Sequence, residues 1–259
     1  YGMGMGGTVL AGLTAPRISD AWGLTAPFIV AAGLLIVVGV GFVLIARDPP
    51  VPRPAPLSIG ASLSAFRGAG SARAWGLTLF YFLSFGGFVA MFLYLPKLLT
   101  SVFDLTKTDA GGRAAGFALL AVIARPAGGI LSDRVGAERV LRWSFLATAL
   151  LALCLAGTYK HIVTITIFCL ALAVAFGLGT GAVFKLVAAW FPNRVGAVTG
   201  VVGAAGGLGG FFPPLAMGIV KDATGNYVLG FVLLALVAAI CLATLARLSR
   251  VELRPVAGA

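Results

Sequence analysis

The sequence predicts an all-α integral membrane protein, and three observations lead to that fold class. The chain is 60% hydrophobic and only 10% charged, whereas soluble globular domains carry about 25% charged residues. Its mean hydropathy is +1.05. Several apolar runs reach the roughly 20 residues that a helix needs to cross about 30 Å of hydrocarbon. A lipid bilayer is therefore the expected surrounding of the protein.

The apolar runs predict seven or eight helices in chain order. A partial helix is expected from about Gly2 to Ala15, as the tail of an earlier pattern. The full spans are predicted at about 25–46, 75–99, 111–132, 140–158, 162–190, 195–220 and 227–247.

A segment of different composition separates the first full span from the others. Residues 47–73 hold five prolines and four arginines, and proline blocks the continuation of a helix. We interpret this segment as a cytoplasmic linker between two helix bundles. Residues 1–46 are then the end of an N-terminal bundle, 74–248 a six-helix C-terminal bundle and 249–259 a cytoplasmic tail. Because the chain starts within a helical pattern, we expect most of the N-terminal bundle to be missing.

The basic residues predict the orientation of the chain, because cytoplasmic loops carry an excess of Lys and Arg. One side has the linker together with Arg134, Arg139, Arg142, Arg194, Arg247, Arg250 and Arg254. The opposite side has Arg17, Lys97, Lys107, Lys160 and Lys221, several of them offset by nearby aspartates. This pattern predicts a multi-pass protein of the bacterial cytoplasmic (inner) membrane with a cytoplasmic C-terminus. The net charge of +11 is thereby explained as a topology signal, and no nucleic-acid partner is expected.

Arg125 is the strongest candidate for a functional residue. It interrupts a run from Gly116 to Leu131 that is otherwise apolar or small, and a guanidinium at that depth costs a few kcal/mol at minimum. No Asp or Glu lies within any apolar run, so the simplest partner is a bound anion that the protein transports. The spans also lack histidine, so neither a catalytic set nor a metal site is expected, and no cofactor is implied.

Two further patterns bear on a binding site. Glycines recur on one face of a predicted span at Gly196, Gly200, Gly203, Gly207 and Gly210, and Gly206 and Gly209 broaden that face. Small residues allow close helix packing in lipid, or they leave a bare backbone along a substrate path; both interpretations stay open. Aromatic residues form a stripe at Tyr81, Phe85 and Phe88. Such stripes are more often packing, but beside Arg125 they would suit a flat, weakly hydrated anion.

A charged motif follows the span of Arg125. Residues 129–139 read GILSDRVGAER and fit G-x-x-x-D-R-x-G-x-x-R through Gly129, Asp133, Arg134, Gly136 and Arg139. We expect a short cytoplasmic gating loop that turns at Gly136, with Asp133 capping the next helix or pairing with an arginine. The motif resembles the second-half loop signature of the major facilitator superfamily. Lys185, near the same side, is expected to reach the interface or to add positive potential to the inner exit.

Taken together, these segments resemble the nitrate/nitrite porter family of that superfamily. The resemblance covers nearly the whole chain and is carried by LFYFLSFGGFVAMFLYLPKLL (79–99), AGFALLAVIARPAGGILSDRVG (115–136), GLGTGAVFKLVAAWFP (177–192) and GAVTGVVGAAGGLGGFFPP (196–214). Two glycine-rich signatures of the family each contain an asparagine. In this chain Met5 and Gly207 replace them.

The resemblance implies a major facilitator fold, in which this chain is the C-terminal six-helix bundle plus the last one or two helices of the N-terminal bundle. It implies that Arg125 binds the substrate, that Tyr81 and Phe85 flank it, and that the signature glycines, Gly203, Gly206, Gly207 and Gly210 among them, line the path. The implied partners are nitrate or nitrite, the bilayer and the missing bundle. Transport by antiport or by proton symport stays open. The alternative is a major facilitator carrier or exporter of another small organic anion or a drug.

Overall fold

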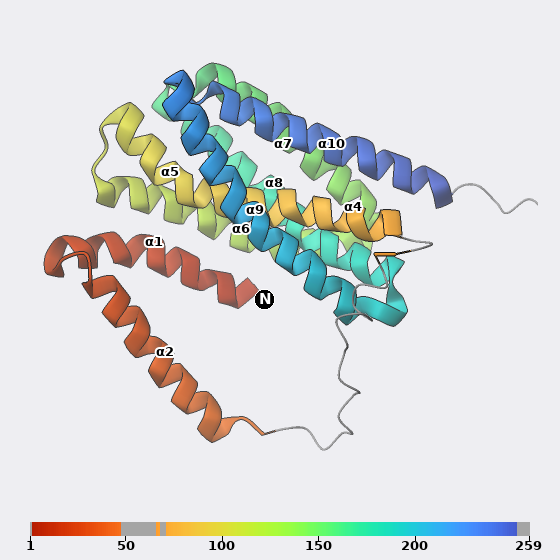
Figure 1. The fold of residues 1–259 in the computed structure, drawn as a ribbon, viewed down its shortest axis with the longest axis horizontal. Coiled ribbons are helices and arrows are strands. Elements are labelled where there is room, and N and C mark those ends of the chain that lie inside the picture. Colours follow the sequence, from red (N-terminus) through yellow and green to blue (C-terminus); the bar gives the residue numbers. More distant parts are fainter. Residues whose placement is uncertain (1, 48–65, 68–70, 253–259) are drawn as a thin grey trace, which may run out of the picture.

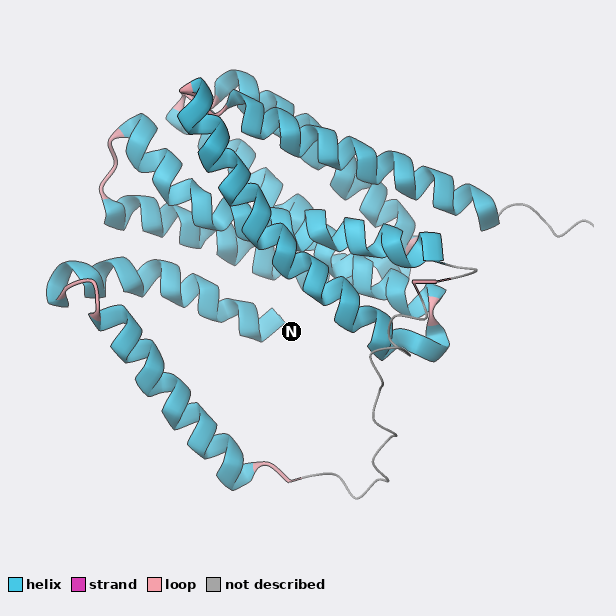
Figure 2. Cartoon of the chain, viewed as in Figure 1, coloured by secondary structure: helices cyan, strands magenta, loops and turns pink. Residues whose placement is uncertain are grey.

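The computed structural model describes residues 2–47, 66–67 and 71–252, and every regular element among them is a helix (Figure 2). The predicted all-α class is therefore confirmed. The elements are α1 (Gly2–Trp22), α2 (Ala26–Ile45), α4 (Ser71–Tyr81), η1 (Phe82–Gly86), α5 (Gly87–Phe103), α6 (Lys107–Val135), α7 (Ala137–Thr158), α8 (Ile162–Trp190), η2 (Pro192–Arg194), α9 (Val195–Thr224) and α10 (Val228–Glu252).

Seven helical segments of the described chain are long and apolar enough to cross a membrane. They coincide with the seven full spans predicted from hydropathy. The first segment differs from its prediction, because α1 continues to Trp22 and contains Pro16 within it. Most of the predicted linker, 48–65 and 68–70, and the end of the tail, 253–259, lie outside the described residues.

The ends of the long helices follow from their local sequences. Thr106 caps α6 by accepting a hydrogen bond from the backbone N–H of Asp109 at 3.1 Å, and its hydroxyl donates to the Asp109 carboxylate at 2.8 Å. This cap satisfies the Asp109 N–H, a backbone donor that has no partner within the helix. At the other end of α6, Gly136 has a φ of +92°, a conformation that glycine adopts without steric cost.

The C-terminal bundle is built around α6 and α8, with α7 packed against both α8 and α10 (Figure 1). Glycines bring the backbones of α6 and α8 together. A Cβ on Gly177 would lie 2.5 Å from the carbonyl oxygen of Ala121, and one on Gly128 would lie 2.4 Å from that of Leu178. Close approach through small residues is how helices associate in lipid, where the hydrophobic effect between them is absent.

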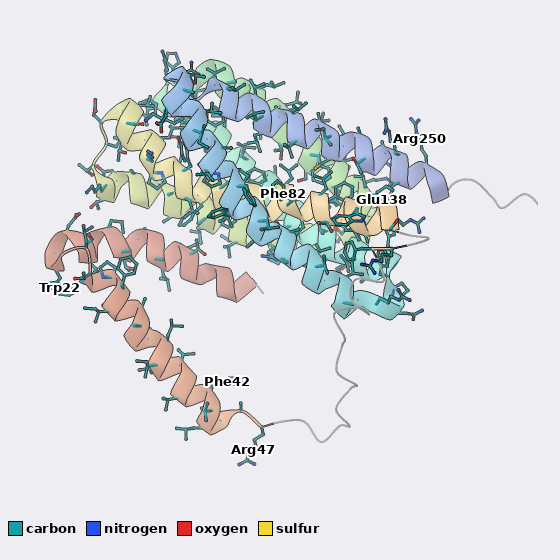
Figure 3. All side chains as sticks on the ribbon, viewed as in Figure 1. Trp22, Phe42, Arg47, Phe82, Glu138 and Arg250 are labelled. Atoms are coloured by element: carbon teal, nitrogen blue, oxygen red, sulfur yellow. The ribbon has the colours of Figure 1, made fainter. Side chains whose placement is uncertain are left out.

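The segment from α4 through η1 to α5 forms one long span, which packs against α9. The starts of α4 and α9 and the end of α10 lie at one end of the bundle, at the right in Figure 1. Glu138 and Arg250, labelled in Figure 3, lie toward that same end. The predicted cytoplasmic arginines that the structure describes, those of the turns and Arg250, therefore share one side of the bundle.

Helix α1 lies along α6, whereas α2 leaves the bundle (Figure 1). A Cβ on Gly12 would lie 3.2 Å from the Cβ of Ala115. Nearby, the Thr108 hydroxyl donates a hydrogen bond to the Asp20 carboxylate at 2.9 Å. No residue of α2 is buried. An apolar helix that is exposed on all sides requires lipid or other helices around it.

Candidate functional site

Arg125 lies in the second half of α6, and only 6% of its surface is exposed. Its Nη2 donates a hydrogen bond to the hydroxyl oxygen of Tyr81, the last residue of α4, at 3.3 Å. The next residue is Pro126, which has no N–H and so cannot bond the carbonyl of Val122. The guanidinium is therefore held by α4 at a point where the hydrogen-bond ladder of α6 is interrupted.

Aromatic rings surround the guanidinium. The Cζ of Arg125 lies 6.0 Å from the ring centre of Phe85 and 5.9 Å from that of Phe184. The Tyr81 and Phe85 rings stack 5.2 Å apart and nearly parallel, while Phe184 meets Tyr81 edge-on at 4.9 Å. Cations favour ring faces at these distances. We call these four residues the Arg125 site.

A π-helix orients the aromatic residues of the Arg125 site. Residues Phe82 to Gly86 form η1, directly after Tyr81, and Phe85 lies within it. A π-turn is wider than an α-turn, and such turns are common at functional sites. The third residue of the predicted stripe, Phe88, lies beyond η1 and stacks on Phe117 at 5.8 Å and Phe92 at 6.4 Å. Its ring centre also lies 6.4 Å from that of Phe85, so Phe88 connects the Arg125 site to the packed core between α5 and α6.

Gly206 allows the aromatic pair to reach its position. A Cβ there would lie 2.5 Å from the Tyr81 ring and 2.9 Å from the Phe85 ring. One turn further, a Cβ on Gly209 would lie 2.4 Å from the carbonyl oxygen of Phe82, and one on Gly210 would lie 2.8 Å from Val89. This side of α9 therefore packs closely against the span that carries the Arg125 site.

The rest of the glycine ladder has different surroundings. At Gly196, Gly200, Gly203 and Gly207 an added Cβ would meet no atom of the described residues within 4 Å. Of the two interpretations, close packing within this bundle holds for Gly206, Gly209 and Gly210 but not for Gly203 and Gly207. One glycine-rich helix thus has a packed side and an open side.

The charged motif differs from the predicted loop in two ways. Its residues are almost all helical, because α6 runs to Val135 and α7 starts at Ala137, so Gly136 alone connects them. Asp133 neither caps α7 nor pairs with an arginine. It pairs with Lys185 of α8, with its Oδ1 2.7 Å from the Lys185 Nζ. The predicted roles of Asp133 are therefore wrong, since its carboxylate in the last turn of α6 faces α8 rather than α7.

The other motif residues lie at the surface of the same end. Gly129 lies one turn before Asp133 on α6, and a Cβ there would lie 4.0 Å from the Lys185 side chain. Arg134 is exposed, and Arg139 donates to the Val135 carbonyl at 3.5 Å. The motif therefore holds the ends of α6, α7 and α8 together, and its gating role stays a prediction.

Sequence reasoning missed Phe184 and the π-helix. Phe184 lies in α8, about 60 residues from Arg125 along the chain, in a run where aromatic residues are ordinary packing. Its position follows from the close contact of α8 with α6, where a Cβ on Gly181 would lie 2.2 Å from the Arg125 carbonyl oxygen. No group of three His, Cys, Asp or Glu among the described residues is placed to hold a metal ion.

Comparisons with known proteins identify the fold and the family. The family model of the Major Facilitator Superfamily matches residues 99–258. Among solved structures, a major facilitator transporter, FucP, in the outward conformation aligns over 88% of this chain and 56% of its own, with a TM-score of 0.62 and 20% identity. A bacterial homologue of the human lysosomal transporter Spinster, inward-facing, aligns over 97% of this chain and 70% of its own, with a TM-score of 0.67 and 18% identity.

Curated relatives are more similar in sequence. The probable nitrate/nitrite transporter NarK2 of Mycobacterium tuberculosis is 42% identical over 90% of this chain and 59% of its own length. The probable nitrate transporter NarT of Staphylococcus haemolyticus is 38% identical over 97% of this chain and 64% of its length. The nitrite extrusion protein of Bacillus subtilis is 45% identical over 63% of this chain and 41% of its length.

This chain thus spans about three-fifths of the first of these relatives. The helical fold, the matched family model and the relatives agree on one class of membrane protein. The chain therefore belongs to the Major Facilitator Superfamily, and its resemblance to the nitrate/nitrite porter family is confirmed.

Proposed function

We propose that this chain forms the C-terminal half of a secondary carrier that moves nitrate and nitrite by alternating access. The observation that carries the proposal is the Arg125 guanidinium, buried between two aromatic rings with the Tyr81 hydroxyl at 3.3 Å. Nitrate and nitrite are planar monoanions. A guanidinium offers them two parallel N–H donors in one plane, and the neighbouring aromatic rings present flat apolar faces to a planar, weakly hydrated anion.

The charge and polarity of the Arg125 site favour this class of substrate over strongly hydrated anions. Rings replace water poorly around sulfate or phosphate, which need many hydrogen bonds when buried. A weakly hydrated monoanion needs few, and Arg125 with Tyr81 supplies them. NarK2 is named for both of these anions and NarT for nitrate.

A second bundle completes the proposed carrier. Helix α2 has no buried residue, and the open side of α9 at Gly200, Gly203 and Gly207 has room for a facing helix or for a passing substrate. Carriers of this type are built from two repeated halves with the substrate between them near the midplane. We infer that the end of the bundle with Arg134 and Arg139 faces the cytoplasm of a bacterial cell, as the positive-inside rule predicts.

Counterflow tests the proposed function. The complete natural chain is reconstituted in liposomes loaded with unlabelled nitrite, and uptake of labelled nitrate is measured with and without a protonophore. We expect saturable uptake that internal nitrite accelerates, with sulfate and drug-like anions unable to replace it. Insensitivity to the protonophore indicates antiport, and loss of uptake indicates proton symport. Saturable uptake of an organic anion in place of nitrate would contradict the proposal and favour the alternative carrier.

The isolated chain tests the two-bundle arrangement. On its own it should bind or transport no nitrate, because the Arg125 site lacks its facing half and exposing such a charge to lipid is costly. Co-expression with the N-terminal bundle, split within the 47–73 segment, should restore uptake. Saturable uptake by the isolated chain would instead show that two copies of this chain form the site.

A further inference from the structure

A cavity lies on the far side of the bundle from α1, between α5, α9 and α10. Its volume is about 290 Å³, near the lower end of the range of small-ligand sites, about 300–1,000 Å³. Every side chain along it is apolar or absent. Phe82, labelled in Figure 3, forms one wall, with Ala90 beside it. Met217 of α9 and Gly230 of α10 lie against each other at another part of the cavity wall.

Irregular helices create this cavity. The π-helix η1 begins at Phe82 and widens one wall. In α9, Pro213 and Pro214 remove two N–H donors and place their rings against the carbonyls of the preceding turn. Gly230 leaves the third wall without a side chain, and a Cβ there would lie 3.0 Å from the Met217 side chain. The π-turn and the two prolines leave space between the helices, whereas Met217 and Gly230 mark the point where α9 and α10 touch.

The cavity opens to the surface that faces hydrocarbon. Two of its lining residues, Phe212 and Leu233, are 52% and 39% exposed. The lining residues belong to helices that are long and apolar enough to span a membrane, and from this we infer that the mouth of the cavity faces acyl chains. Helix α1, the only described helix of the proposed other bundle that packs on this one, lies against α6 on the opposite side (Figure 1).

A basic residue stands one turn beyond the cavity wall. Pro213, Met217 and Lys221 follow at intervals of four residues and share one face of α9. The Lys221 ammonium lies 5.2 Å from the ring centre of Tyr227, and the Tyr94 hydroxyl donates to the Met217 carbonyl at 3.4 Å. Tyrosines gather where hydrocarbon meets lipid headgroups. An ammonium at that level is placed to pair with a phosphate.

We propose that this cavity binds one glycerophospholipid, with an acyl chain between α9 and α10 and the headgroup phosphate at Lys221. The apolar lining matches the chain, and the cationic end matches the phosphate. The exposed carboxylate of the neighbouring Asp222 offsets part of the lysine charge, so the acyl chain supplies most of the affinity. The site is separate from the Arg125 site and does not depend on which anion the protein carries.

Native mass spectrometry of the complete natural chain, delipidated and then incubated with phosphatidylethanolamine, tests the acyl-chain part. Ala216→Trp fills the cavity from an exposed position, and Leu215→Trp adds the same ring next to it outside the cavity. We expect Ala216→Trp to retain one phospholipid fewer than the unchanged protein and Leu215→Trp to retain the same number. Equal numbers in the two variants would overturn the proposal.

Two further measurements cover the headgroup and any folding defect. Lys221→Gln should weaken phospholipid binding several-fold, whereas Lys160→Gln, an exposed lysine at the same end, should not. Displacement by a fatty alcohol as readily as by phospholipid would overturn the headgroup assignment. If Ala216→Trp does not fold, Phe82→Trp replaces it. With the four native tryptophans first replaced by phenylalanine, its fluorescence should be quenched by acyl-brominated phospholipid at a lower lipid fraction than that of Leu236→Trp on the outside of α10. Equal quenching would contradict a bound chain.

Discussion

Arg125 and Lys185 are both cations within the spans of one bundle, yet their surroundings differ. Arg125 is 6% exposed and contacts a tyrosine hydroxyl and two phenylalanine rings. The Lys185 side chain is 47% exposed and pairs with the Asp133 carboxylate at 2.7 Å. Two consecutive residues of α8 contribute to the two surroundings: Phe184 contacts Arg125, and Lys185 contacts Asp133.

The difference separates two uses of a charge in a membrane. An exposed ion pair contributes little free energy, about 0–1 kcal/mol, and solvent screens it. A guanidinium buried beside aromatic rings attracts an anion more strongly than an exposed cation does, because the surrounding dielectric is low. We therefore expect substrate binding to depend strongly on Arg125 and weakly on Lys185.

The largest effect should come from Arg125→Lys. Lysine keeps the charge but loses the planar pair of donors, and one hydrogen bond to a charged group contributes about 1.5–3 kcal/mol. Nitrate counterflow in liposomes should then show an apparent affinity lower by roughly tenfold to a hundredfold. A near-normal affinity would mean that charge alone is enough and would remove the distinction between the two cations.

Gly206→Ala should come next, because it disturbs the Arg125 site without changing any charge. The added methyl must displace the Tyr81 and Phe85 rings, and overpacking of this kind costs about 1–3 kcal/mol. We expect nitrate uptake to fall by about tenfold. Gly218→Ala, also on α9, where the added methyl meets no described atom within 4 Å, is the matched control and should transport nearly normally. Equal losses would show that the open side of α9 is packed as tightly as the other.

Tyr81→Phe should have a smaller effect, since it removes one hydroxyl and leaves the stacked ring in place. The hydrogen bond from Arg125 Nη2 to the Tyr81 hydroxyl, 3.3 Å long, is then absent. Its net contribution is about 1 kcal/mol, because a bound anion can accept from the same N–H. The measurement is the half-saturation concentration for nitrate, which should rise several-fold while the maximal rate changes little. A large fall in the maximal rate with unchanged affinity would assign Tyr81 to the conformational step instead.

The smallest effect is expected from breaking the exposed pair. Lys185→Gln and Asp133→Asn should each change nitrate affinity by less than about fivefold, in line with the weakness of exposed pairs. The double variant should behave as either single variant does, because both remove the same contact. An affinity loss as large as that of Arg125→Lys would place Lys185 in the substrate path.

The spans could be predicted from the sequence because hydropathy and length determine them in a bilayer. The turn at Gly136 was predicted and is confirmed by its φ of +92°. The continuation of α6 and α7 right up to this residue was not predicted, because the charged residues on either side look like an ordinary basic loop in sequence. Asp133 shows the same limit. It was predicted to lie in the loop after the span at 111–132, whereas α6 continues to Val135. Its partner Lys185 depends on how α6 and α8 cross, which the sequence of either helix does not reveal.

The candidate site shows where sequence reasoning stops. Arg125 was found because a charge in an apolar run is costly, and Tyr81 and Phe85 because of the resemblance. Phe184 carried no such signal. The glycine ladder indicated a face of α9, but the spacing could not say that Gly206 contacts the Arg125 site while Gly203 and Gly207 remain open. The residues Phe82 to Gly86 form a π-helix, and their sequence does not distinguish it from an α-helix.

The single-residue connection at Gly136 has a mechanical consequence. One residue spans at most about 3.3–3.6 Å, so α6 cannot slide along its axis without taking the start of α7 with it. Helix α7 is in turn tied to the end of α10, where the Ser249 hydroxyl donates to the Glu138 carboxylate. The three helices are thus coupled at this end of the bundle. We expect a shift of α6 along the membrane normal, which carries Arg125 with it, to move the start of α7 and the end of α10 as well.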